Sequence, residues 1–266
     1  MKKFVFLVLA ITLVSCARHN EITYIVTKRH SNGSAKEAVY CNKATNLEIV
    51  KVTFDTKGNG VSEGKIPDGV NRFYTEAGSF YAEEQYKNGK QNGRARYFDK
   101  KGRVVGEEVY LDGKLNGVSR TFYENGKPEI VQNYRDDKAF GPEKTYYQNG
   151  NLKSEEMYAG EINASTFKKK YYEDGKPESE EVISGDGKEF SLKKYYTNGK
   201  LQSERVNTDK GVNGQETRYH EDGTVSAVDT FKNGFKINSR YFDNTGKQIA
   251  YQDFTKTTIT SGPEKK

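Results

Sequence analysis

The feature of this sequence that most limits its fold is a block of about 24 residues that recurs eight times. A fixed period of this length is typical of repeat architectures, in which each unit is stabilised by stacking on its neighbours. The sequence therefore predicts an array of small similar units. Each copy closes on a glycine, and the eight glycines are Gly78, Gly102, Gly126, Gly150, Gly175, Gly199, Gly223 and Gly246.

The pattern within a unit predicts a β-hairpin. The closing glycine often follows asparagine, as in Asn125-Gly126, which favours a three-residue loop whose last residue is left-handed. The residue four positions before the glycine then faces the position two after it, a mostly apolar column that includes Val104 and Leu152. That earlier residue is always aromatic, and we expect the column to form the structural core: Tyr74, Phe98, Phe122, Tyr146, Tyr171, Tyr195, Tyr219 and Phe242.

Strand alternation predicts which other columns share a face with these core aromatics. A column of small residues such as Ala82 and Ser203 is expected on the same face. A column of Arg and Lys is also expected there, either with its stems packed over the rings or as a ladder for an anionic polymer. A glutamate column is expected on the opposite, solvated face: Glu83, Glu107, Glu155, Glu180 and Glu204.

Two copies, which end at Gly150 and Gly199, carry the pattern Gly-x-x-Arg/Lys-x-Tyr-Tyr-x-Asn-Gly-Lys well. This pattern resembles the bacterial variant of the MORN repeat (membrane occupation and recognition nexus), and the resemblance covers roughly residues 69–254. It implies an all-β array of antiparallel hairpins that acts as an interaction scaffold. Some bacterial relatives are labelled antitoxin-like, so the resemblance also implies a distant alternative, inhibition of a partner protein.

Residues 1–15 predict a lipoprotein signal peptide. Lys2 and Lys3 precede an apolar run, Phe4 to Val14, that is too short to span a bilayer core of ~30 Å as a helix. The run leads into Leu13-Val-Ser-Cys16, which resembles a lipobox. The resemblance implies cleavage before Cys16 and lipidation of that residue, and multiple acyl chains anchor stably. The alternative is an ordinary secretory peptide in which Cys16 has no role.

The remaining segments complete the predicted organisation. Residues 16–22 are expected to form a tether, 23–68 strands that cap the array, 69–254 the repeats, and 255–266 a disordered tail. After lipidation one cysteine remains, Cys41, in an apolar context that favours a buried thiol. Ala17, rather than aspartate, follows Cys16, which in enteric-type sorting indicates the outer membrane rather than the inner one.

Several kinds of chemistry have no support in the sequence. The three histidines have no metal-ligand spacing, and no phosphate-binding glycine loop is present. The chain has 43 Lys and Arg against 37 Asp and Glu, a mixed charge that does not predict nucleic-acid binding. We therefore expect no enzyme activity, no cofactor and no metal.

One stripe of side chains is a candidate ligand contact. The residue after the core aromatic is tyrosine in four consecutive copies, and the flanking copies have Asp99 and His220. Rings about 9–10 Å apart along a sheet suit an extended glycan or peptide. The alternative is that each ring lies over its own hairpin turn. The four residues are Tyr123, Tyr147, Tyr172 and Tyr196.

Together these features predict a lipid-anchored bacterial envelope protein with a non-enzymatic binding or scaffolding role. Its expected partners are the membrane, through the lipid, and a protein or an envelope polymer, but no nucleic acid. The alternative function is a module that binds a glycan or an anionic polymer of the envelope.

Overall fold

The computed structural model describes residues 19–158, 166–185, 189–208 and 213–255. Over these residues the chain is all-β, as predicted, and contains no helix, so none of them forms a helix that could cross a membrane. The chain divides into two compact units, Met1–Lys90 and Gln91–Lys266. We refer to them as unit 1 and unit 2.

Unit 1 contains four strands that precede the repeats and the first repeat hairpin. β1, β2, β3 and β4 pair in this order, each antiparallel to the next. The other edge of β1 pairs in parallel with β5. The hairpin is β5 and β6. The strands are β1 (Asn20–Arg29), β2 (Ala35–Asn42), β3 (Glu48–Phe54), β4 (Gly60–Gly64), β5 (Gly69–Tyr74) and β6 (Phe80–Lys87).

Strand β1 begins inside the segment that was expected to be a tether. Ile22 is fully buried and pairs with Asn42 of β2. The tether prediction is therefore wrong for residues 20–22, because the alternating apolar pattern of β1 already starts there. Aromatic rings pack nearby, with ring centroids 5.1 Å apart for Tyr24 and Tyr40 and 6.2 Å apart for Tyr40 and Phe73.

Cys41 lies in β2 and is buried, as predicted, with 6% of its surface exposed. Burial raises the pKa of its thiol above the ordinary value, which keeps the group protonated and poorly reactive. Cys16 and the predicted signal peptide lie outside the described residues.

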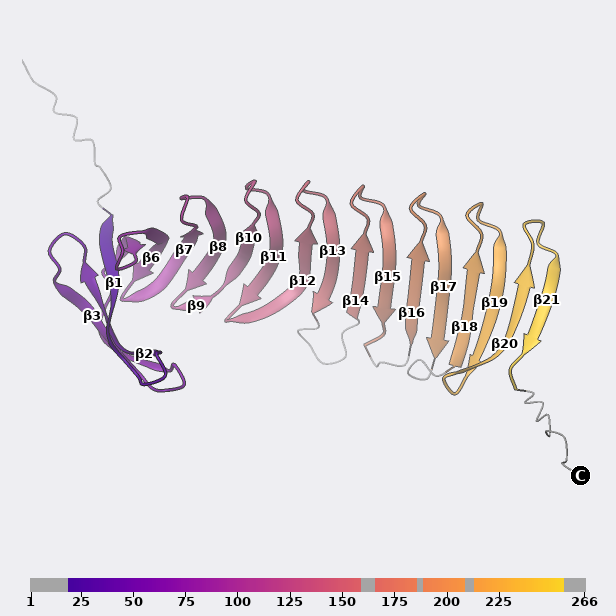
Figure 1. Ribbon diagram of the computed structural model, residues 1–266, viewed down its shortest axis with the longest axis horizontal. Coiled ribbons are helices and arrows are strands. Elements are labelled where there is room, and N and C mark those ends of the chain that lie inside the picture. The colour runs from indigo at the N-terminus through magenta and orange to yellow at the C-terminus, as the bar shows by residue number, and fades with distance from the viewer. Residues whose placement is uncertain (1–18, 159–165, 186–188, 209–212, 256–266) are drawn as a thin grey trace, which may run out of the picture. The chain divides into compact units, whose positions relative to one another are not determined.

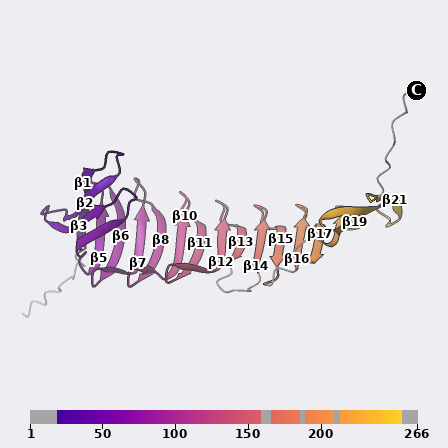
Figure 2. The same cartoon turned by 90° about the horizontal axis from the view of Figure 1, so that it is seen from below.

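Unit 2 is an antiparallel succession of strands, and both views show those from β10 to β17 as a single row (Figures 1 and 2). Within the described part of unit 2, no second layer covers either face. The strands are β7 (Lys90–Phe98), β8 (Val104–Leu111), β9 (Lys114–Leu115), β10 (Gly117–Phe122), β11 (Pro128–Arg135), β12 (Lys138–Tyr146), β13 (Leu152–Tyr158), β14 (Thr166–Tyr171), β15 (Pro177–Ile183), β16 (Phe190–Tyr195), β17 (Leu201–Thr208), β18 (Asn213–Tyr219), β19 (Val225–Lys232), β20 (Phe235–Phe242) and β21 (Gln248–Asp253).

The predicted hairpin loops are confirmed. In the third copy Tyr123 N donates to Lys127 O and Gly126 N donates to Tyr123 O, both at 2.9 Å, which closes a loop of three residues. Gly126 has a φ of 80°, the left-handed conformation that glycine adopts without strain. The predicted pairing holds in all eight hairpins: Tyr74 with Phe80, Phe98 with Val104, Phe122 with Pro128, Tyr146 with Leu152, Tyr171 with Pro177, Tyr195 with Leu201, Tyr219 with Val225 and Phe242 with Gln248.

Each hairpin also contains a β-bulge that the sequence analysis did not anticipate. Phe122 faces Pro128 but Thr121 faces Ile130, so Glu129 has no partner within this hairpin. The same register shift follows the loop in all eight hairpins. One extra residue on one strand reverses the alternation of faces beyond it.

The bulge makes two of the expected face assignments wrong. The column of small residues lies opposite the residue that precedes the core aromatic, as Ala82 lies opposite Phe73, and therefore on the other face. The glutamate column lies opposite the basic column, on the same face as the aromatics, and we call this face the aromatic face. Arg72 Nε is 3.0 Å from Glu83 Oε2, and Lys144 Nζ is 3.3 Å from Glu155 Oε1.

The core aromatics are half-buried in every copy. The buried residues of unit 2, among them Ala95, Ser203, Ala227 and Ser239, lie instead on the face opposite the aromatics. Because no second layer within the described part of unit 2 covers either side, this unit has two partly solvated faces rather than one packed and one solvated face.

Candidate functional site

The four predicted ligand tyrosines lie between the loops of successive hairpins, and we call each such space a junction. Their hydroxyls donate across the junction to the carbonyl of the core aromatic in the next copy. The contacts are Tyr123 Oη to Tyr146 O at 2.6 Å, Tyr147 to Tyr171 at 2.8 Å, Tyr172 to Tyr195 at 2.7 Å and Tyr196 to Tyr219 at 2.7 Å.

Other side chains link the loops in the same direction. His220 Nε2 lies 3.2 Å from Phe242 O, Lys176 Nζ donates to Thr197 O at 2.9 Å, and Lys127 Nζ donates to Asn149 O. The ladder of tyrosines therefore joins five successive hairpins, from the third copy to the seventh, whereas the alternative interpretation placed each ring over its own turn. These contacts favour a structural role for the tyrosines, and a ring-stacking ligand site there stays a prediction.

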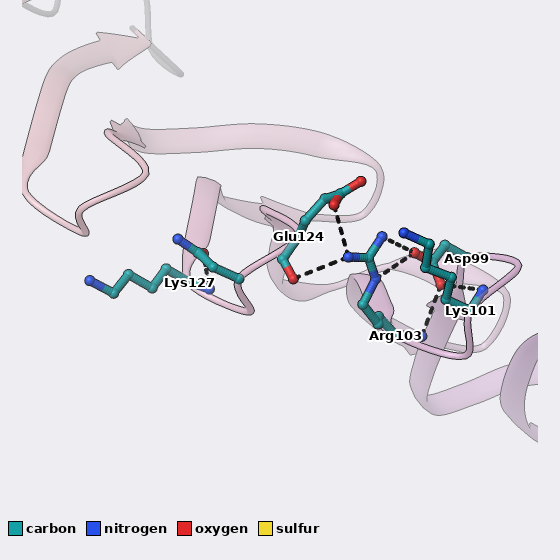
Figure 3. Close-up of polar contacts among 6 residues, drawn as sticks. Asp99, Lys101, Arg103, Glu124 and Lys127 are labelled. Carbon is teal, nitrogen blue, oxygen red and sulfur yellow. Dashed lines mark hydrogen bonds and ion pairs between the residues drawn. The ribbon is translucent and has the colours of Figure 1, made fainter.

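One junction in unit 2 lacks a bridging ring, because Asp99 occupies the position of the tyrosine. Arg103 forms the bridge instead (Figure 3). Its Nη2 lies 2.6 Å from Asp99 Oδ2 in its own loop, and its Nη1 lies 2.9 Å from Glu124 Oε2 in the next loop. Asp99 Oδ1 also accepts the backbone N–H groups of Lys101 and Arg103, at 2.8 and 3.0 Å, which fixes the loop.

These contacts hold all three groups in their charged forms. The backbone N–H and the guanidinium of Arg103 both lower the pKa of the Asp99 carboxyl. Arg103 likewise lowers the pKa of Glu124, and the two carboxylates raise the pKa of the guanidinium further. Arg103 is consequently held between two loops at neutral pH.

Beside this bridge lies a surface hollow of about 500 Å³, which we call the Arg103 hollow. β8 and β10 pair at two positions, Arg120 with Glu107 and Thr121 with Gly106, and the residues between these pairs and the two loops do not pair across the junction. Figure 3 shows Lys127 directed away from the Arg103 bridge. The hollow is lined by Arg103, Val104, Glu107, Phe122, Tyr123, Glu124, Asn125 and Gly126.

The basic column of the aromatic face is matched by the glutamates. In addition to the ion pairs of Arg72 and Lys144, Tyr219 Oη donates to Glu204 at 2.6 Å and Tyr195 Oη donates to Glu180 at 3.4 Å. A glutamate of one copy thus accepts the hydroxyl of the core tyrosine in the next copy. The ion pairs with Glu83 and Glu155 compensate the charges of Arg72 and Lys144, which favours the structural interpretation of the basic column over a ladder for an anionic polymer.

A buried charge cluster near the C-terminal end was missed in the sequence. Asp229 is 2% exposed and lies 3.1 Å from Arg218 Nη2 and 2.9 Å from Lys236 Nζ, and it accepts the hydroxyl of Ser239. Burial alone would raise the pKa of Asp229, but the hydrogen bonds and the two cations outweigh it and lower the pKa below its ordinary value. Within the described ranges, no three His, Cys, Asp or Glu side chains are grouped so that they could hold a metal.

Comparisons with known proteins agree with the repeat pattern. A family model described as the MORN repeat variant matches residues 115–136, 141–159, 191–207 and 212–233. No curated protein matches the chain.

Matches to solved structures are distant. They include crystal structures of TcdB2-TccC3 (12% identity, 88% of this chain and 17% of that chain, TM-score 0.22) and of a eukaryotic initiation factor (10%, 83% and 84%, 0.22). Another is the Photorhabdus luminescens Tc holotoxin pore (9%, 86% and 15%, TM-score 0.17). This chain thus spans less than a fifth of the TcdB2-TccC3 and holotoxin chains.

Proposed function

Because the chain belongs to the MORN repeat variant family, we propose that it is a lipid-anchored protein of the bacterial cell envelope that binds a partner through its repeats. MORN repeats are generally non-catalytic and suggest a binding or scaffolding role. The observation that carries the proposal is the loop edge of unit 2, where side chains join successive hairpins into one surface. The anchor is Cys16, and the outer membrane is its expected location.

Anchoring is tested by replacing Cys16 with serine. Without the thiol no thioether to a lipid forms, so the variant is expected to leave the membrane pellet or to accumulate unprocessed, as fractionation and mass spectrometry of the N-terminus would show. Cys41→Ser is the matched control, because it removes the other cysteine, which is buried in β2, and is expected to leave fractionation unchanged. A Cys16→Ser chain that is processed normally and stays in the pellet would exclude lipid anchoring.

Partner binding is tested with a photo-crosslinking amino acid in living cells. At Asn125, in a hairpin loop that lines the Arg103 hollow, the probe is expected to form one dominant adduct with an envelope protein, seen as a shifted band and identified by mass spectrometry. The control position is Phe235, which is 76% exposed at the opposite ends of the strands. Adducts of equal yield at both positions would argue against the loop edge. Retention by an envelope polysaccharide without a protein adduct would favour the glycan-binding alternative.

A further inference from the structure

We propose that the Arg103 hollow binds a tyrosine side chain of the partner protein, with the phenol ring against Phe122 and Val104 and the hydroxyl donated to Glu107. This inference rests on the binding role proposed above and names the chemistry of one contact. The junction at Arg103 differs from the others in its aromatic side chains.

Two tyrosines that other junctions contribute are absent here. The bridging position holds Asp99, whereas the next four copies have tyrosine and the one after has histidine. The core position of the following copy holds Phe122, which has a ring but no hydroxyl. At later junctions the core tyrosines Tyr195 and Tyr219 donate their hydroxyls to the glutamates Glu180 and Glu204 of the preceding copy. The array therefore shows, at its own junctions, how this glutamate column receives a phenol.

Glu107 belongs to the same column and lines the hollow. Its side chain makes no hydrogen bond or ion pair within the part of the chain that the structure describes, although Arg96 and Arg120 lie opposite it on the two neighbouring strands. The residue is half-buried, so the lack of a donor leaves a partly desolvated acceptor beside an open site. A hydroxyl that reaches Glu107 would make a charge-assisted bond, which is stronger than a bond between neutral groups.

The rest of the lining suits a phenol as well. Val104 and Phe122 supply apolar surface for a ring, and Tyr123 also lines the hollow. Arg103 is held at the border of the hollow by its ion pairs with Asp99 and Glu124, so its side chain does not fill the space. A side chain with an apolar body and one polar tip matches this combination, and tyrosine is enriched at protein interfaces for that reason.

The test uses the purified chain with N-acetyl-tyrosinamide as probe and ¹⁵N NMR shifts of Asn125 and Gly126 as readout. We expect saturable shifts with a Kd of roughly millimolar order, because one side chain offers few atoms. The phenylalanine analogue lacks the hydroxyl and is expected to bind at least about 10-fold more weakly, the factor that corresponds to one hydrogen bond to a charged group. Methyl β-glucoside, which represents a glycan, is expected to give no shift.

Two variants and one control distinguish a specific site from non-specific binding to the surface. Glu107→Gln is expected to remove the preference for the phenol, and Glu155→Gln, in the same column but paired with Lys144, is expected to leave it unchanged. Val104→Phe fills the floor with a residue that the first copy carries at the same position, Phe80, and is expected to abolish the shifts in a chain that remains folded.

Equal binding of both amides, binding that survives Val104→Phe, shifts caused by the glucoside, or no shift at millimolar probe would each overturn the assignment. None of these outcomes bears on membrane anchoring or on an adduct at the loop edge, so a failure here can be told apart from a failure of the proposed function.

Discussion

Asp229→Asn is expected to lower the free energy of unfolding by about 2–4 kcal/mol. Removing one partner of a buried ion pair costs about 3–5 kcal/mol because the other charge stays uncompensated. Here the side chains of Arg218 and Lys236 are 40% and 36% exposed, so water solvates part of their charge. The expected loss of stability is therefore smaller than for a fully buried pair. Urea melts of the wild-type and variant chains measure the difference.

The effect has a pH signature. The folded chain lowers the pKa of Asp229, so the stabilisation is fully present above the ordinary carboxyl pKa of about 3.9 and is lost as the pH falls through the folded value. The asparagine variant should lack this acid dependence. Glu156→Gln is the matched control, because its ion pair with Lys168, at 2.8 Å, is about 40% exposed on both sides and is expected to contribute only about 0.2–1 kcal/mol. Equal losses in the two variants would contradict the special role of Asp229.

The second large effect is expected when the tyrosines at positions 123, 147, 172 and 196 are all changed to phenylalanine. Each change keeps the ring and removes one hydroxyl-to-carbonyl bond between neighbouring copies. With about 0.5–1.5 kcal/mol per bond and separate sites, the combined loss is about 2–6 kcal/mol. Urea melts measure it, and hydrogen exchange should show faster opening in copies three to seven.

The control for this set is Tyr134→Phe. Tyr134 is half-buried, and its hydroxyl makes no hydrogen bond within the described residues. A quadruple variant that loses less than ~0.5 kcal/mol would show that the ladder does not stabilise the array. The set also addresses the ligand prediction: stacking on these rings should survive the change to phenylalanine, whereas the change to serine should abolish it.

The hairpins could be predicted because their signals are local. An aromatic four residues before the glycine that ends the loop determines both the loop and the pair across it, and all eight pairs were correct. The faces could not be predicted, because the bulge has no residue signature. The bulged residues include tyrosine, valine, glutamate, lysine and serine, as in Tyr81, Val105 and Glu129.

The Asp229 cluster depends on the register shift at the bulge, which the sequence did not predict. The cluster around Asp229 draws on three strands, and only the true register brings Arg218, Lys236 and Ser239 onto its face. The Arg103 hollow had a visible signal, since Asp99 departs from the tyrosine column. The sequence alone did not show that a tyrosine at this position bridges to the next copy, so the consequence of Asp99 for the junction could not be predicted.

Because four successive junctions use the same tyrosine-to-carbonyl contact, the repeat pattern itself sets no limit to the number of copies. β21 keeps an outer edge that pairs with no described strand, and Ile249 and Tyr251 remain 63% and 57% exposed along it. Gene duplication could insert one more copy by repeating contacts that already exist, without redesign of a core. Each insertion would displace the surfaces on either side of it by about 9–10 Å. The number of copies thus sets the distance between binding surfaces, in steps of one repeat.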